Sequence, residues 1–107
     1  MVDGATFTRM AMLLPETVAA PHFDRTAFKV RRIYATLAAD GRSANLMFKP
    51  EEQEFKCMLA PEVFQRIDNG WGRKGATTLW LEKASEEDAR AALKMAHAHA
   101  VVRARTP

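Results

Sequence analysis

The segment NGWGRKG, residues 69–75, combines residue types that bind phosphate groups in many proteins. Three glycines surround Trp71, Arg73 and Lys74, so backbone N–H groups and two cations lie close together. The segment is not a P-loop, because GxxxxGK[ST] is absent, and not a dinucleotide fingerprint, because it leads into an alternating apolar run and not into a helix. We therefore predict a loop before a strand, in which glycines permit positive φ or close backbone approach and Trp71 anchors the cations beside the sheet.

Other basic residues cluster around residues 25–42 and near the glycine segment, and the aromatic residues Tyr34 and Trp80 are interleaved with them. A sheet or hairpin edge that displays cations and rings can follow a nucleic-acid backbone through phosphate contacts and stacking. The leading prediction is therefore a non-enzymatic nucleic-acid-binding module. The candidates for phosphate contacts are Arg25, Lys29, Arg31, Arg32, Arg73 and Lys74, with Trp71 as a stacking or loop-locking group.

Two alternatives remain open. A pocket for a small molecule or anion between the sheet and the PHFDR and WGR segments would be lined by His22, Arg25, Trp71 and Arg73, with the imidazole able to donate or accept a hydrogen bond near neutral pH. In a structural or partner-binding protein the same segments would serve folding alone.

Patterns for catalysis and metal binding are absent from the sequence. His97 and His99 are two residues apart on an expected helix, so they point about 160° apart and cannot share one ion. Cys57 lies among apolar residues, which is typical of a small core side chain. There is no GxSxG elbow, and the acidic clusters fall at two expected helix N-termini. We predict no enzymatic activity, metal site or cofactor.

The chain has 107 residues, which we interpret as one domain over residues 1–107. Its hydrophobic fraction of 48% is typical of a globular protein. A formal net charge of +3 and a pI near 9.4 favour anionic partners only mildly. No apolar run is long enough to span a membrane and no leader pattern is present, so we expect a cytoplasmic protein, as a monomer or weak homodimer.

The periodicity of apolar residues predicts an α+β fold, an antiparallel sheet with helices packed on one face in the order α-β-β-β-β-α-β-α. The expected helices cover residues 8–14, 51–60 and 86–104, with a further helical turn within 61–67. The expected strands fall within residues 18–23, 27–30, 33–37, 44–48 and 76–83. Asp40-Gly41 predicts a hairpin turn, and Pro50 predicts a helix start.

The helical spacing also predicts which side chains are buried. Thr6 is the expected N-cap of the first helix, and Ser85 with Asp88 resembles a capping box at the last. The expected buried faces are Phe7, Met10, Leu13 and Leu14 in the first helix, Phe55, Met58 and Leu59 in the second, and Ala89, Ala92, Leu93, Ala96 and Ala100 in the last.

The segments APHFDRTAFKV, IYATLAADG, KPEEQE and NGWGRKGAT, in this order, resemble the MmcQ/YjbR family of small bacterial proteins over residues 14–96. The most diagnostic positions are Pro21-His22-Phe23, Arg25, Phe28, residues 35–37 and residues 70–73. The resemblance implies a CyaY-like α+β fold and a DNA-binding role through a double-wing motif, and it carries over no catalytic residues. Thr26 and Ala27 replace the usual Pro-Ser, and Ala76 replaces a frequent Trp, which removes an aromatic ring beside the glycine segment.

Overall fold

The computed structural model describes residues 1–105, and the side chains of residues 1–102. The helices are α1 (Gly4–Met12), α2 (Pro50–Leu59), α3 (Gly70–Arg73) and α4 (Glu86–Arg105). The strands are β1 (Val18–His22), β2 (Arg25–Lys29), β3 (Ile33–Leu37), β4 (Ser43–Met47), β5 (Phe64–Arg66) and β6 (Ala76–Trp80).

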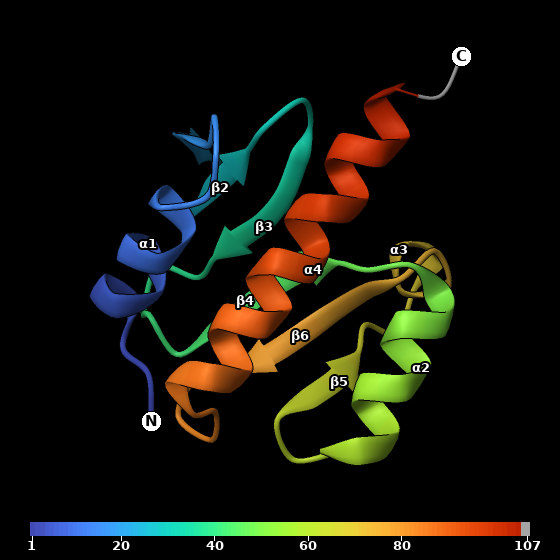
Figure 1. Ribbon diagram of the computed structural model, residues 1–107. Coiled ribbons are helices and arrows are strands. Elements are labelled where there is room, and N and C mark those ends of the chain that lie inside the picture. The colour runs from blue at the N-terminus through green and yellow to red at the C-terminus, as the bar shows by residue number, and fades with distance from the viewer. Residues whose placement is uncertain (106–107) are drawn as a thin grey trace.

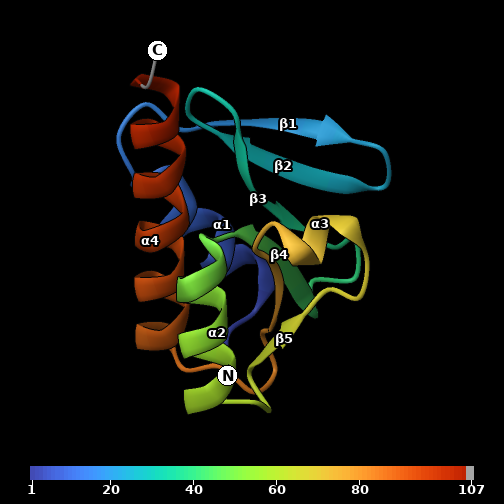
Figure 2. The ribbon, with the colours of Figure 1, turned by 90° about the vertical axis from the view of Figure 1, so that its right-hand side faces the viewer.

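The six strands form one antiparallel sheet in the order β1-β2-β3-β4-β6-β5. Helices α1, α2 and α4 lie on one side of the sheet, and α3 lies on the other (Figures 1 and 2). The predicted α+β class and the order of the main elements are confirmed. Two short elements, β5 and α3, are added to the predicted order.

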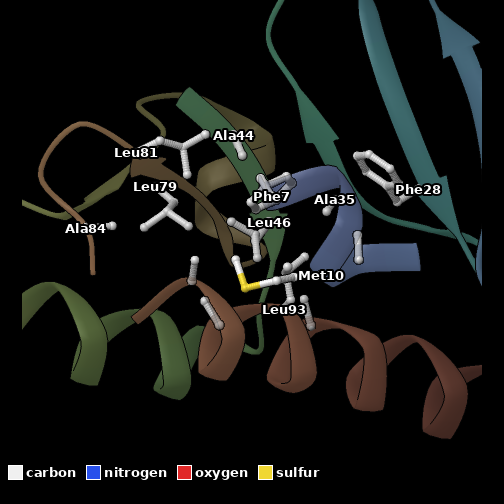
Figure 3. Close-up of a cluster of buried hydrophobic side chains, with 14 of the residues drawn as sticks. Phe7, Met10, Phe28, Ala35, Ala44, Leu46, Leu79, Leu81, Ala84 and Leu93 are labelled. Atoms are coloured by element: carbon white, nitrogen blue, oxygen red, sulfur yellow. The ribbon is translucent and has the colours of Figure 1, made fainter. Parts of the chain in front are cut away.

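The core lies between the sheet and helices α1 and α4 (Figure 3). Leu46 and Leu79 come from neighbouring strands and meet Leu93 of α4. Phe7 of α1 packs edge-on against Phe28 of β2, with ring centroids 6.0 Å apart. The predicted arc of α4 is buried along its length: Ala89, Ala92, Leu93, Ala96 and Ala100. Alanines let this long helix approach the sheet closely.

The helix ends follow local capping rules. Ser85 and Asp88 form the predicted reciprocal box, in which each backbone N–H donates to the other side chain at 3.0 and 3.1 Å. The N-cap of α1 is Asp3 and not Thr6: the Asp3 carboxylate accepts from the Thr6 N–H at 2.8 Å, which lowers the pKa of this carboxyl. The helix therefore begins four residues earlier than predicted.

Tyr34 occupies a β-bulge that turns it out of the predicted alternation. Phe28 pairs with Ala35 and Lys29 with Ile33, so Tyr34 is an extra residue in β3. Its ring is fully buried, and its hydroxyl lies 3.0 Å from Thr17 Oγ1. Burial raises the pKa of this phenol. Tyr34 is therefore part of the core. The prediction that its ring is interleaved with the surface cations and available for stacking is wrong.

The prediction of a buried apolar face on α2 is wrong. Phe55, Met58 and Leu59 are all exposed, Met58 by 70% of its surface, and the inward-facing residue is Gln53. The helix packs on the narrow edge strand β5. The amide of Gln53 donates to the carbonyls of Gly72 in α3 and Ala76 at the start of β6, which an apolar side chain could not satisfy. The helix is therefore rotated so that its apolar stripe faces solvent. Leu13, beyond the end of α1, is also exposed.

The segment after α2 is a strand and not the predicted helical turn. Phe64 pairs with Leu79, and Arg66 pairs with Thr77, in antiparallel register. Phe64 is buried while the next two residues are exposed. Three residues are too few for a period to show in the sequence, and pairing with β6 decides the conformation.

Truncating one leucine on α4 and one on α2 tests whether each helix buries its apolar side chains. Leu93→Ala is expected to lower the free energy of unfolding by about 2–5 kcal/mol, because it leaves a cavity in the core. Leu59→Ala is expected to change it by less than about 0.5 kcal/mol, since the side chain is already in water. Urea denaturation monitored by circular dichroism measures both. A large loss in Leu59→Ala would show that the stripe on α2 is covered.

Candidate functional site

The face of the sheet opposite α4 is formed by the polar side chains that alternate with the buried apolar ones along each strand. Thr36, Asn45, Thr78 and Gln65 lie in one row across β3, β4, β6 and β5. Thr78 Oγ1 donates to Asn45 Oδ1 at 3.0 Å, and the indole N–H of Trp80 donates to Gln65 Oε1 at 3.1 Å. This face is therefore an ordered polar surface.

The β1–β2 hairpin extends away from α4, and its tip lies on the same side of the sheet as α3 (Figure 2). Phe23 at the tip has a positive φ of 59° and is 94% exposed. Its ring contacts His22 edge-on, with centroids 4.9 Å apart. A bulky residue in left-handed backbone with its ring in water is disfavoured both sterically and by hydration. Strained backbone of this kind is concentrated at functional sites in proteins.

A cleft of about 520 Å³ lies between the hairpin, the open face and α3. Its volume falls within the range of about 300–1,000 Å³ that small-molecule sites occupy. One side is formed by His22, Phe23, Asp24 and Arg25 of the hairpin, together with Arg32 and Ile33 where the chain enters β3. The floor is formed by Ala35, Thr36, Asn45, Met47 and Ala76, and the facing side by Ile67, Asn69 and Trp71.

Arg25 is fixed within this cleft by the strand beside it. Its Nε donates to Thr36 Oγ1 at 2.8 Å, and its Nη2 donates to the Thr36 carbonyl at 3.2 Å. A guanidinium has five N–H donors, so others stay available for a ligand. Among the side chains of residues 1–102, no carboxylate pairs with Arg25. The cleft therefore holds a positioned positive charge that is not neutralised by an ion pair.

The glycine segment precedes strand β6, as predicted, but it forms a single helical turn, α3, where we predicted a loop. Asn69 caps it, because its Oδ1 accepts from the Gly72 N–H at 3.1 Å. A Cβ on Gly72 would lie 1.5 Å from the Ile67 carbonyl oxygen. Gly75 has φ 117°, and a Cβ there would lie 1.9 Å from the Phe48 carbonyl oxygen. Close backbone approach is therefore the physical requirement at both positions.

Gln53 holds this turn from behind. Its Nε2 donates to the carbonyls of Gly72 and Ala76, both at 2.9 Å. The Gln53 side chain is buried, so these bonds form away from competing water. One amide thus joins α2, the α3 turn and the start of β6.

Trp71 does not anchor the turn as predicted, because 63% of its surface is exposed. It lines the cleft, and it also lines a second hollow of about 410 Å³ with Arg73 and Lys74. The Lys74 ammonium lies 5.5 Å from the centroid of the indole. Within residues 1–102 neither cation forms an ion pair, so neither is neutralised by Asp24 or Glu82.

The structure gathers most of the predicted site residues around one face. His22, Arg25 and Trp71 of the alternative pocket line the cleft, together with Arg32, while Arg73 lies in the adjoining hollow. Lys29 and Arg31 are exposed near the far end of β2, outside the cleft. Cleft residues that the sequence analysis did not name as site candidates include Phe23, Asp24, Thr36, Asn45 and Met47. The last three alternate with buried residues along β3 and β4, and this alternation could have shown that they face away from the core.

Groups for nucleophilic or metal chemistry are not gathered at this site. Burial raises the pKa of the Cys57 thiol, which disfavours the reactive thiolate. Within the described residues, no group of three or more His, Cys, Asp or Glu side chains is placed to hold a metal ion. None of the described helices is long and apolar enough to cross a membrane.

Two glycine substitutions test the α3 turn. Gly72→Ala is expected to destabilise the fold by about 1–3 kcal/mol or more, because the new methyl group overlaps a backbone carbonyl that cannot move freely. Gly70→Ala is the matched control, since its methyl group would meet only the end of Arg73 at 3.6 Å. Thermal unfolding compares the two. Equal melting temperatures would contradict the close approach at Gly72.

Comparisons with known proteins identify a similar fold and do not indicate a function. No family model matches the chain. A search of curated proteins also finds no match. Among solved structures, the crystal structure of Deinococcus radiodurans protein DR2400, a DUF419 domain, is similar with a TM-score of 0.84 and 19% identity, covering 99% of this chain and 83% of that one. The chain therefore shares the fold of a DUF419 domain.

Proposed function

We propose that this protein is a non-enzymatic module that binds nucleic acid on the face formed by the β1–β2 hairpin, the open sheet and α3. The observation that carries the proposal is the pairing of exposed rings with cations that lack ion-pair partners within residues 1–102. Phe23 and Trp71 stand on the hairpin and α3 sides of the cleft. Arg25 lies inside it, and Arg73 and Lys74 lie beside it.

Charge and exposure support contact with a polyanion. Lys29 and Arg31 extend the positive surface along the hairpin, and both are exposed. Exposed rings between cations suit a chain that alternates phosphates with flat bases. Asp24 is the acidic residue within this otherwise basic border.

We also propose membership of the MmcQ/YjbR family and a cytoplasmic location. The support for the family is the shared residues of the PHF and WGR segments, which lie at the hairpin tip and in α3, together with the α+β fold. The hairpin that carries Phe23 fits the wing that the family resemblance implies. The support for the location is the single cysteine and the lack of an apolar run that would span a membrane.

A second candidate function is the binding of a small anion within the cleft. The observation that favours it is the meeting of His22, Arg25 and Trp71 around a recess of about 520 Å³. A fixed guanidinium with spare donors suits a phosphate or carboxylate. In this case the recess alone would form the site, and Lys29 and Arg31 would have no part in it.

Salt dependence tests the leading proposal. With three to six phosphates contacted, the observed binding constant for a labelled oligonucleotide should fall with salt, with a log–log slope of about −2 to −5. Arg73→Gln should weaken binding and make the slope shallower by about 0.7–0.9, because one phosphate contact is lost. Lys94→Gln on α4 removes the same charge from the opposite side and should leave the slope unchanged. Failure to bind single strands and duplexes at low salt would overturn the proposal.

A melting-temperature screen tests the second candidate. A cleft ligand at a hundred times its Kd should stabilise the protein by about 2.7 kcal/mol, and its melting temperature should rise accordingly. Arg25→Ala should abolish the rise, whereas Lys29→Ala, outside the cleft, should preserve it. The probes are inorganic phosphate, sugar phosphates and dicarboxylates. A rise that survives in Arg25→Ala would place the ligand elsewhere.

A further inference from the structure

We infer that the cleft takes a single unpaired nucleobase, so that the protein prefers single-stranded nucleic acid to a duplex. This inference rests on the proposed function and specifies which form of nucleic acid the same face recognises. It is carried by the position of Trp71, by the chemistry of the cleft floor and by the size of the recess.

Trp71 stands between a cationic hollow and the floor of the cleft, whose side chains carry no charge. On one side, the indole lines the hollow of about 410 Å³ that contains Arg73 and Lys74. On the other, it lines the cleft floored by Asn45 and Met47. A nucleotide has the same division, with a charged phosphate next to a flat uncharged base. A strand can therefore place a phosphate at the cations and the adjoining base against the indole.

The Lys74 ammonium lies over the indole ring, 5.5 Å from its centroid. A cation on one face of an indole leaves the other face for a second flat group, and a base meets it by stacking. Trp80 is the other tryptophan on this side of the sheet, but it lies outside the cleft and its N–H is engaged by Gln65 at 3.1 Å. The two tryptophans therefore differ in the role expected of them.

The cleft floor can read the edge of a base. Asn45 Oδ1 accepts from Thr78, which leaves the Asn45 NH₂ group as a donor. Thr36 Oγ1 accepts from Arg25 Nε, so its own hydroxyl hydrogen is free to be donated. On the hairpin side of the cleft, the Asp24 carboxylate supplies an acceptor. Met47 adds apolar surface against the ring. Donors, an acceptor and apolar contact together match the edge and face of an unpaired base.

A duplex cannot use this recess in its resting form. Its bases are stacked on both faces, and their Watson–Crick edges are engaged by the opposite strand. Inserting one would require extrusion from the helix, with loss of stacking and pairing. Phosphates of a duplex could still contact the exposed cations, but the cleft of about 520 Å³ would stay without a base. In a single strand the bases are unpaired, so this cost is much smaller.

Fluorescence anisotropy with three labelled probes and one competition experiment tests the inference at low salt. The probes are a thymidine strand of roughly eight nucleotides, the same strand with abasic sites at its central positions, and a blunt duplex. In the competition experiment, thymidine monophosphate is added to the intact strand. The abasic strand keeps the phosphates and loses the bases. We expect the intact strand to bind about 5- to 150-fold more tightly than the abasic strand, the effect of one base–aromatic stack.

Matched variants assign this difference to the cleft. Trp71→Ala should weaken the intact strand to the level of the abasic strand, and Trp80→Ala should retain the difference. Both side chains are substantially exposed, so both variants are expected to fold, and circular dichroism verifies this. Asn45→Ala should reduce the preference for the intact strand through loss of the edge contact. Each of these results supports base insertion at Trp71.

Other outcomes overturn the inference in distinguishable ways. Equal affinity for the intact and abasic strands, or tighter binding of the duplex, refutes base insertion and leaves the proposed nucleic-acid function standing. Competition by thymidine monophosphate at concentrations equal to those of the strand assigns the cleft to a free small ligand and refutes strand recognition. No binding of any probe refutes the proposed function itself.

Discussion

The two hydrogen bonds from the buried amide of Gln53 fix the relation between the second helix and the open face. They reach the carbonyls of Gly72 and Ala76 at 2.9 Å each, so α2, α3 and the start of β6 are held as one unit. Loss of this donor would leave buried carbonyls with fewer partners, which is costly in a protein interior. The position of Trp71 at the cleft therefore depends on a residue that lies on the helix side and outside the cleft lining.

The same interaction explains why α2 exposes its apolar stripe. Gln53 and Phe55 lie two positions apart on a helix, about 160° around its axis, so they cannot both face inward. Turning the amide toward the glycine turn places Phe55, Met58 and Leu59 in solvent. Burial of three apolar side chains would favour the opposite rotation. The observed rotation instead keeps the two hydrogen bonds from Gln53 that order α3.

The fold was predictable because its strongest signals are local. Period-two alternation, the Asp40-Gly41 turn, Pro50 at a helix start and the Ser85 box each act over a few residues, and the structure contains them. The burial of Tyr34 was not predicted because a bulge depends on how two strands pair, and the sequence of one strand does not show this. Phe64 was misassigned for the same reason, since β5 exists only through its pairing with β6.

The candidate site was predictable in its residue types but not in its shape. Sequence patterns brought His22, Arg25 and Trp71 together as one possible lining, yet they did not show that the hairpin tip and α3 would face each other across the sheet. That geometry follows from sheet order, because β1 and β2 form one edge and β5 leads into α3 at the other. Successive side chains of a strand point to opposite faces of the sheet. Apolar residues face α4, so the polar residues between them lie on the opposite face. The hairpin and α3 convert that polar face into a recess.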